Sequence, residues 1–142
     1  MGKIIKISEK LYQFRDETAL IIVAAKQEGR VFRAGNGELE LLEKFRVSTP
    51  HFSDNEGMSQ ERGRRENIIE ENIHHEYFEH FQKLLRSLAP RLKPTHIYLF
   101  APAHVAGELE NIVRPIFGAL AVRTVTGIFT KDTPVEFLER LH

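Results

Sequence analysis

The run ALIIVAA at residues 19–25 constrains the fold of this chain more than any other stretch. Its seven residues are all apolar and several are β-branched, which favours an extended strand. A strand with one face in water alternates polar and apolar residues, and this run shows no alternation. We therefore expect a strand covered on both faces, in the middle of a sheet. The run is far too short for a membrane span, which needs about 20 residues.

The patterns that follow supply the neighbours of this strand. Asn36-Gly37 is a strong signal for a two-residue hairpin between strands at 30–35 and 38–47, which predicts a three-stranded antiparallel meander. Residues 133–136 (TPVE) form a capping box that opens a terminal helix. The remaining elements are predicted as a helix at 66–90, a strand at 95–102, a strand at 121–129 and the terminal helix at 134–142. Residues 103–120 are predicted to be helical at least to Val113, with Pro115 breaking or kinking the helix.

Right-handed crossovers would place the fourth strand beside the first and the fifth outside it. We therefore predict a single α/β domain over residues 1–142, with a mixed five-stranded sheet in the order 3-2-1-4-5 and helices on its faces. This arrangement is ribonuclease-H-like. Residues 1–16 contain the short apolar pieces KIIKI and LYQF, which would add an edge strand or pair with a second subunit, so a homodimer is compatible with the sequence.

Charge and composition narrow the classes of function. Twenty basic and twenty acidic residues cancel, so any contact with nucleic acid or a membrane needs a local patch. The absence of cysteine excludes thiolate nucleophiles, disulfides and cysteine zinc sites. The first residues contain no apolar run of signal-peptide length, so we expect a cytoplasmic protein. No pattern predicts a cofactor.

The stretch HHEYFEH at residues 74–80 suggests a metal site at first sight. On a helical wheel at about 100° per residue, however, His74 and His80 lie on opposite margins of the apolar stripe and His75 faces water. Helical ligands of one metal share a face, and the zincin motif His-Glu-x-x-His fails because Glu79 occupies the place of its second histidine. We therefore expect a solvated face with charge pairs; a two-ligand metal site completed by another element is the less favoured alternative.

Residues 48–65 form an overlong polar connection, and loops of this length tend to be functional or disordered. Arg62, Arg64 and Arg65 concentrate positive charge at its end, and arginines in a loop can contact phosphates. Glutamates flank them, so a merely solvated loop is the alternative. Other basic residues that could add to a positive surface are Arg30, Arg33, Arg46, Arg86, Arg91 and Lys93.

The sequence also bears on two hydrolytic chemistries. Nucleases on a ribonuclease-H-like sheet hold divalent metals with carboxylates, one of which projects from the first strand, and the run at 19–25 has none. Glu108, Glu110 and Asp132 could contribute, so a metal-dependent nuclease or hydrolase stays open as an alternative function. Residues 51–54 (HFSD) contain the groups of a hydrolytic triad but no strand-to-helix elbow and no oxyanion donors.

Three stretches resemble the bacterial host-attachment protein family, which is regarded as an offshoot of the archaeal and eukaryotic peptide-chain release factors and Pelota. They are HFSDNEG at 51–57, IYLFAPAHVAGELE at 97–110 and GIFTKDTPVEFLERL at 127–141, and the resemblance covers about residues 18–142. It implies the fold of the release-factor central domain and a link to translation. The family's name implies a role in adhesion to a host, which is a third candidate function.

In release factors, the loop before the long helix carries Gly-Gly-Gln, which promotes peptidyl-tRNA hydrolysis in the peptidyl-transferase centre. The matching stretch NEGMSQERGRRE lacks this motif, so no catalytic residue carries over. We therefore predict a non-catalytic binding domain, linked to translation or the ribosome, that contacts RNA or a protein partner through the loop at 53–65. The candidate binding residues are Ser53, Asp54, Gly57, Gln60, Arg62, Arg64 and Arg65.

Overall fold

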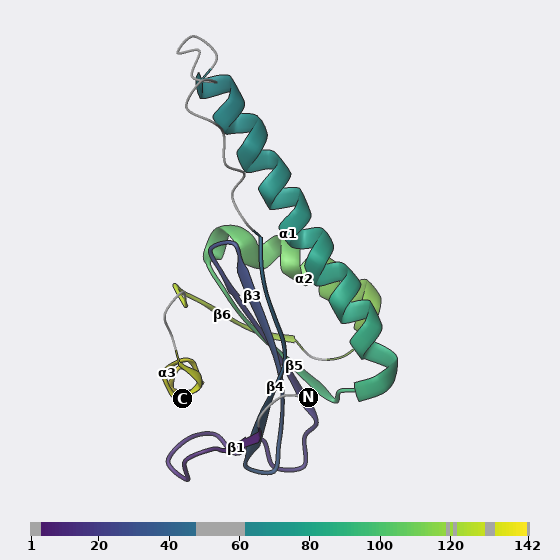
Figure 1. The fold of residues 1–142 in the computed structure, drawn as a ribbon. Helices are drawn as coiled ribbons and strands as arrows, with labels where there is room; N and C mark the ends of the chain where they lie inside the picture. The colour runs from purple at the N-terminus through teal and green to yellow at the C-terminus, as the bar shows by residue number, and fades with distance from the viewer. Residues whose placement is uncertain (1–3, 48–61, 119, 121, 130–132, 142) are drawn as a thin grey trace.

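A mixed sheet of six strands forms the centre of the computed structural model (Figure 1). The strands are β1 (Ile4–Lys6), β2 (Ala19–Ala25), β3 (Glu28–Gly35), β4 (Glu38–Arg46), β5 (His96–Ala101) and β6 (Val122–Thr126). They follow one another in the order β1-β4-β3-β2-β5-β6. The structure describes residues 4–47, 62–118, 120, 122–129 and 133–141, and only the backbone of 62–72.

β2 lies inside this sheet, and all seven of its residues are buried. It pairs antiparallel with β3, where Ile22 faces Val31, and parallel with β5, where Ile22 faces Leu99. Both edges of the strand are therefore hydrogen-bonded and both faces are covered by apolar side chains. The uninterrupted apolar run requires such a position, and the predicted doubly covered strand is confirmed.

Helices cover the two faces of the sheet (Figure 1). α1 (Arg62–Leu92) and α2 (Ala103–Phe117) pack on one face, and α3 (Pro134–Glu139) packs on the other together with side chains from residues 7–14. The α1 side chains buried in the first of these cores are Tyr77, Phe78, Phe81, Leu85 and Leu88. Each contributes about 1.5–3 kcal/mol through burial, so the C-terminal half of α1 is firmly held against the sheet.

A β-bulge between β3 and β4 changes which face the β4 side chains reach. Val31 faces Glu43, whereas the next residue of β3 faces Leu41, so Leu42 is an extra residue on β4. Leu41 consequently packs toward the α3 side and Phe45 toward the α1 side, although the two residues are four positions apart. An unbroken strand would place them on the same face, because side chains alternate with a period of two.

The predicted mixed α/β architecture with helices on its faces is confirmed, but the prediction of five strands is wrong. Residues 4–6 add a sixth strand at the edge, where Ile5 faces Leu39 of β4. α1 begins at Arg62 instead of residue 66 and continues through Pro90 to Leu92, because near a helix end only one turn has to accommodate the missing backbone donor. The ribonuclease-H-like assignment stays a prediction. In the described part of the chain, no helix is long and apolar enough to cross a bilayer.

We predict that Gly29→Ala lowers the free energy of unfolding by about 1–3 kcal/mol, because it overpacks the core between β3 and α1. An added Cβ would lie 2.4 Å from Phe45 Cε1 and 2.6 Å from Phe81 Cζ. Gly107→Ala in α2 is the matched control, since nothing lies within 4 Å of its added Cβ. This helical alanine should stabilise the protein by about 1 kcal/mol. Urea unfolding followed by circular dichroism measures both variants, and equal effects would contradict the packing described.

Candidate functional site

The predicted binding residues divide into two groups. Ser53, Asp54, Gly57 and Gln60 lie outside the described residues. Arg62, Arg64 and Arg65 lie in the first turn of α1, so the prediction that they belong to the loop is wrong. The first residue of this helix is hard to predict from the sequence, because a polar helix end and a polar loop have similar compositions.

The N-terminal half of α1 extends beyond the sheet (Figure 1). The helix has 31 residues, which corresponds to a length of about 46 Å at 1.5 Å per residue. Among the described side chains of α1, Tyr77 is the first that is buried. The backbone at Arg62 therefore lies about 20 Å along the helix axis from Tyr77.

The three histidines of residues 74–80 interact with three different partners. His74 Nε2 lies 3.2 Å from Glu108 Oε1 on α2, and His75 Nε2 lies 3.4 Å from Glu79 Oε2 one turn along α1. The ring of His80 stacks on Phe45 of β4, with 4.6 Å between ring centroids and 10° between planes. The histidines thus diverge as the helical wheel predicts.

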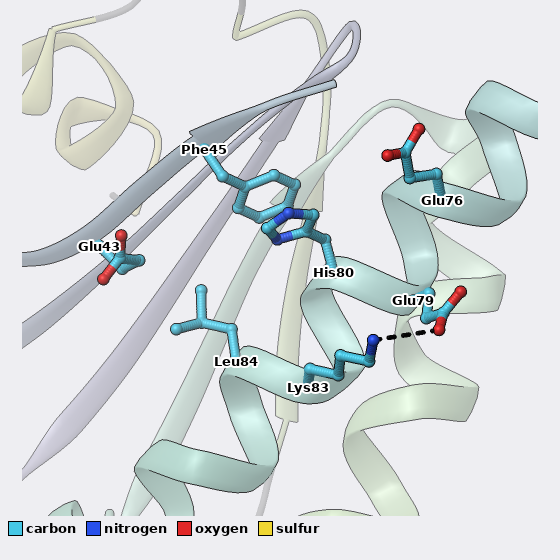
Figure 2. Close-up of a pocket in the computed structure, with 7 residues that line it drawn as sticks. All are labelled: Glu43, Phe45, Glu76, Glu79, His80, Lys83 and Leu84. Atoms are coloured by element: carbon cyan, nitrogen blue, oxygen red, sulfur yellow. Dashed lines mark ion pairs between the residues drawn. The ribbon is translucent and has the colours of Figure 1, made fainter. Parts of the chain in front are cut away.

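His80 forms part of a groove of about 500 Å³ between β4 and α1 (Figure 2). Glu43 reaches it from β4 beside the stacked rings of Phe45 and His80, while Glu76 and Glu79 line it from α1. Glu43 and Phe45 both face α1 because of the bulge at Leu42. This groove could not be found from the sequence, because unbroken alternation along β4 predicts Glu43 on the same face as Leu41.

The groove is predominantly acidic. Its three carboxylates, on Glu43, Glu76 and Glu79, face one lysine. Lys83 Nζ lies 3.2 Å from Glu79 Oε1, so its charge is already compensated (Figure 2). Phosphate groups would be repelled here, and this surface is therefore unsuited to RNA. Across the residues whose side chains are described, no three histidine, aspartate or glutamate side chains are placed so that they could hold one metal ion.

The other basic residues do not form one positive surface. Arg30 donates a hydrogen bond to the Phe129 carbonyl at 3.0 Å on the α3 side, whereas Arg33 pairs with Glu40 at 3.2 Å. Arg86, Arg91 and Lys93 are exposed near the C-terminal end of α1. They lie about 35–45 Å along the helix from Arg62. Arg30 and Arg33 therefore do not join in one positive surface, and Arg86, Arg91 and Lys93 are separate from Arg62, Arg64 and Arg65.

The carboxylates proposed for a nuclease also separate. Glu108 pairs with His74, while Glu110 pairs with Arg114 at 3.2 Å and accepts a hydrogen bond from Thr124 at 3.3 Å. Asp132 lies outside the described residues. Glu108 and Glu110 thus interact with different side chains and do not converge on one site.

A polar cluster around Glu17 was missed by the sequence reasoning. Tyr12 and Tyr98 both donate hydrogen bonds to the Glu17 carboxylate, Tyr98 at 2.6 Å, and His96 Nδ1 lies 3.5 Å from it. Burial, followed by hydrogen bonding with Glu17 and with Tyr12, raises the pKa of Tyr98 well above its ordinary value. The cluster joins the N-terminal segment to the start of β5. No local signal identifies it, because Glu17 and Tyr98 are 81 positions apart.

No protein-family model matches the sequence, and no curated protein matches it. Among solved structures, the chain resembles the crystal structure of an archaeal translation termination factor, aRF1, with a TM-score of 0.45 and 15% sequence identity. The alignment covers 87% of this chain and 37% of that chain, so this chain spans little more than a third of the factor's length. A likeness of this degree does not transfer a function, and membership of the host-attachment family is not shown.

We predict that Tyr98→Phe makes the stability of the protein less dependent on alkaline pH. Because its pKa is raised in the folded state, Tyr98 keeps its proton above about pH 10, where the unfolded chain loses it. Its contribution is therefore complete below about pH 10 and is lost as the pH rises further. Urea unfolding between about pH 9 and pH 11 should give a shallower decline for the variant than for wild type. Identical slopes would contradict the burial of this hydroxyl.

Proposed function

We propose that this chain is a non-catalytic binding domain linked to translation, and that it binds RNA through residues 53–65. The extension of α1 beyond the sheet supports this most directly (Figure 1). Arg62, Arg64 and Arg65 lie at the extended end, in the first turn of the helix. Three arginines within four positions can each neutralise a phosphate and release a counterion, which favours RNA over a neutral protein surface.

The N-terminal end of α1 lies far from the acidic groove between β4 and α1. Glu76 follows Arg62 by 14 residues, or about 20 Å along the helix. Charges in water are screened over about 8 Å at physiological ionic strength, so the groove does not weaken a phosphate contact at the arginines. Glu61 and Glu66 flank the arginines in the sequence. We therefore expect moderate affinity with a strong dependence on salt.

The link to translation draws on the resemblance of residues 51–57, 97–110 and 127–141 to the host-attachment family. Through that family the resemblance extends to the central domain of release factors. We propose with it that the sheet has a ribonuclease-H-like fold and that the protein is cytoplasmic. The RNA of the ribosome is accordingly the first RNA to test.

Sucrose-gradient sedimentation of the protein with purified ribosomes tests the proposal. We expect co-sedimentation at low salt, and its loss in the triple variant Arg62→Ala, Arg64→Ala, Arg65→Ala. The matched control is Arg86→Ala, Arg91→Ala, Lys93→Ala, which removes the same charge from the other end of α1 and should still co-sediment. With isolated ribosomal RNA, the salt dependence of log K should become shallower by about 2–3 in the arginine variant only, since about 0.7–0.9 counterions are released per contact.

Absence of co-sedimentation at low salt, or equal loss in both triple variants, would contradict RNA binding by residues 53–65. Binding to ribosomes without binding to isolated ribosomal RNA would indicate a protein partner instead. When the same samples are incubated with Mg²⁺, Mn²⁺ or Zn²⁺, we expect the RNA to remain uncleaved. Metal-dependent cleavage would favour the nuclease alternative.

A further inference from the structure

A second cavity, of about 540 Å³, lies where three parallel strands end. β2 and β5 run parallel, as do β5 and β6, so their carboxyl ends meet at one edge of the sheet. Ala25 ends β2, Pro102 follows β5, and Ile128 lies two positions after the end of β6; all three line the cavity. Crevices outside the carboxyl ends of parallel strands are common ligand sites in α/β proteins.

Most of the wall of this cavity is apolar. Ile73 of α1, Val105 of α2 and Ile128 contribute aliphatic side chains from three separate parts of the chain. Ile128 is 77% exposed, the highest value among the large hydrophobic residues that are described as exposed. A ligand with an apolar body would cover this side chain and remove its surface from water. The volume falls within the range of about 300–1,000 Å³ that is usual for small-molecule sites.

The polar groups at this cavity favour an anion. Lys26 reaches it from the β2–β3 turn, and His104 from the first turn of α2. No carboxylate among the described residues pairs with Lys26. The turn that carries Lys26 is held in place, because the Val47 amide donates to the Gln27 carbonyl and the Gln27 side chain donates to the Val47 carbonyl, both at 2.8 Å. Lys26 is thus presented at the cavity from an anchored backbone.

The start of α2 adds partial positive charge to the same wall. Pro102 is the N-cap and provides no side-chain cap, and the first turn contains no acidic residue. The amides of Val105 and Ala106 donate to the Pro102 carbonyl at 3.0 Å, whereas those of Ala103 and His104 precede every acceptor that the helix can offer. These two amides complement the side chains of Lys26 and His104, and would attract an anionic group.

His74 also lines the cavity, and it is the one basic side chain there with a carboxylate partner. Its Nε2 lies 3.2 Å from Glu108 Oε1. This pair holds the imidazole at the side of the cavity that faces α2. Tyr77 lies beside it with its hydroxyl donating to the Ala25 and Glu28 carbonyls, at 2.9 and 2.7 Å. Both side chains are therefore held in position by the fold.

We propose that this cavity binds a small organic anion. Its phosphate or carboxylate group lies between Lys26, His104 and the first turn of α2, and its apolar or ring-shaped body packs against Ile73, Val105 and Ile128. The proposal does not depend on the RNA binding proposed above. The cavity also differs in charge from the groove at Glu43 and Phe45, which would repel such a ligand.

Titration of the ¹⁵N-labelled protein with phenyl phosphate, followed by amide chemical shifts, tests this site. We expect saturable shifts at Lys26, Tyr77, His104 and Ile128. Inorganic phosphate has the anion without the ring and phenol has the ring without the anion, so each should bind at least about tenfold more weakly, as expected when one favourable contact is lost. Phenylacetate in the same series distinguishes a carboxylate site from a phosphate site.

Variants then separate the two halves of the site. Lys26→Ala with His104→Ala should weaken phenyl phosphate by about tenfold or more while leaving phenol unchanged, and Ile128→Ser should weaken both ring compounds. Lys10→Ala with His75→Ala is the matched control, because both residues are exposed and neither lines the cavity. The proposal would be overturned if phenyl phosphate caused no chemical-shift changes up to about 10 mM, the range of non-specific contacts. Equal affinity for phenyl phosphate in the Lys26/His104, Ile128 and Lys10/His75 variants would overturn it too.

Discussion

Burial of β2 on both faces is the constraint on which the rest of the structure depends. Its apolar side chains require one layer of helices on each side of the sheet, and α1 and α2 supply the first layer. The buried α1 side chains that meet this requirement lie between Tyr77 and Leu88, and Ile73 packs against them. These contacts anchor the C-terminal half of the helix, and Arg62, Arg64 and Arg65 lie at its N-terminal end.

Features that depend on neighbouring residues could be predicted from the sequence. The apolar run at 19–25 forms the strand it predicts, and Asn36 and Gly37 form the hairpin turn with φ of 47° and 80°. The terminal helix begins at its capping box, where the Thr133 hydroxyl accepts from the Glu136 amide and the Glu136 carboxylate accepts from the Thr133 amide. Each of these signals is complete within a few positions, so no tertiary information is required.

Features that depend on residues far apart in the sequence could not be predicted. The bulge at Leu42 moves Glu43 and Phe45 to the α1 side, and only the register between β3 and β4 reveals it. The stacking of His80 on Phe45 follows from that bulge. The Glu17 cluster joins residues more than 80 positions apart. The start of α1 at Arg62 and the cavity at the carboxyl ends of the strands likewise emerge only from the tertiary structure.

The central claim is RNA contact at the N-terminal end of α1, where Arg62, Arg64 and Arg65 lie. Ultraviolet cross-linking of the protein to ribosomal RNA, with identification of the cross-linked peptides by mass spectrometry, tests it most directly. We predict that the cross-linked peptides lie within residues 53–65 or directly adjoin them. The acidic groove at Glu43 and the C-terminal half of α1 should remain free of cross-links. Cross-links confined to the sheet, or to residues 86–93 at the opposite end of the helix, would contradict the proposed function.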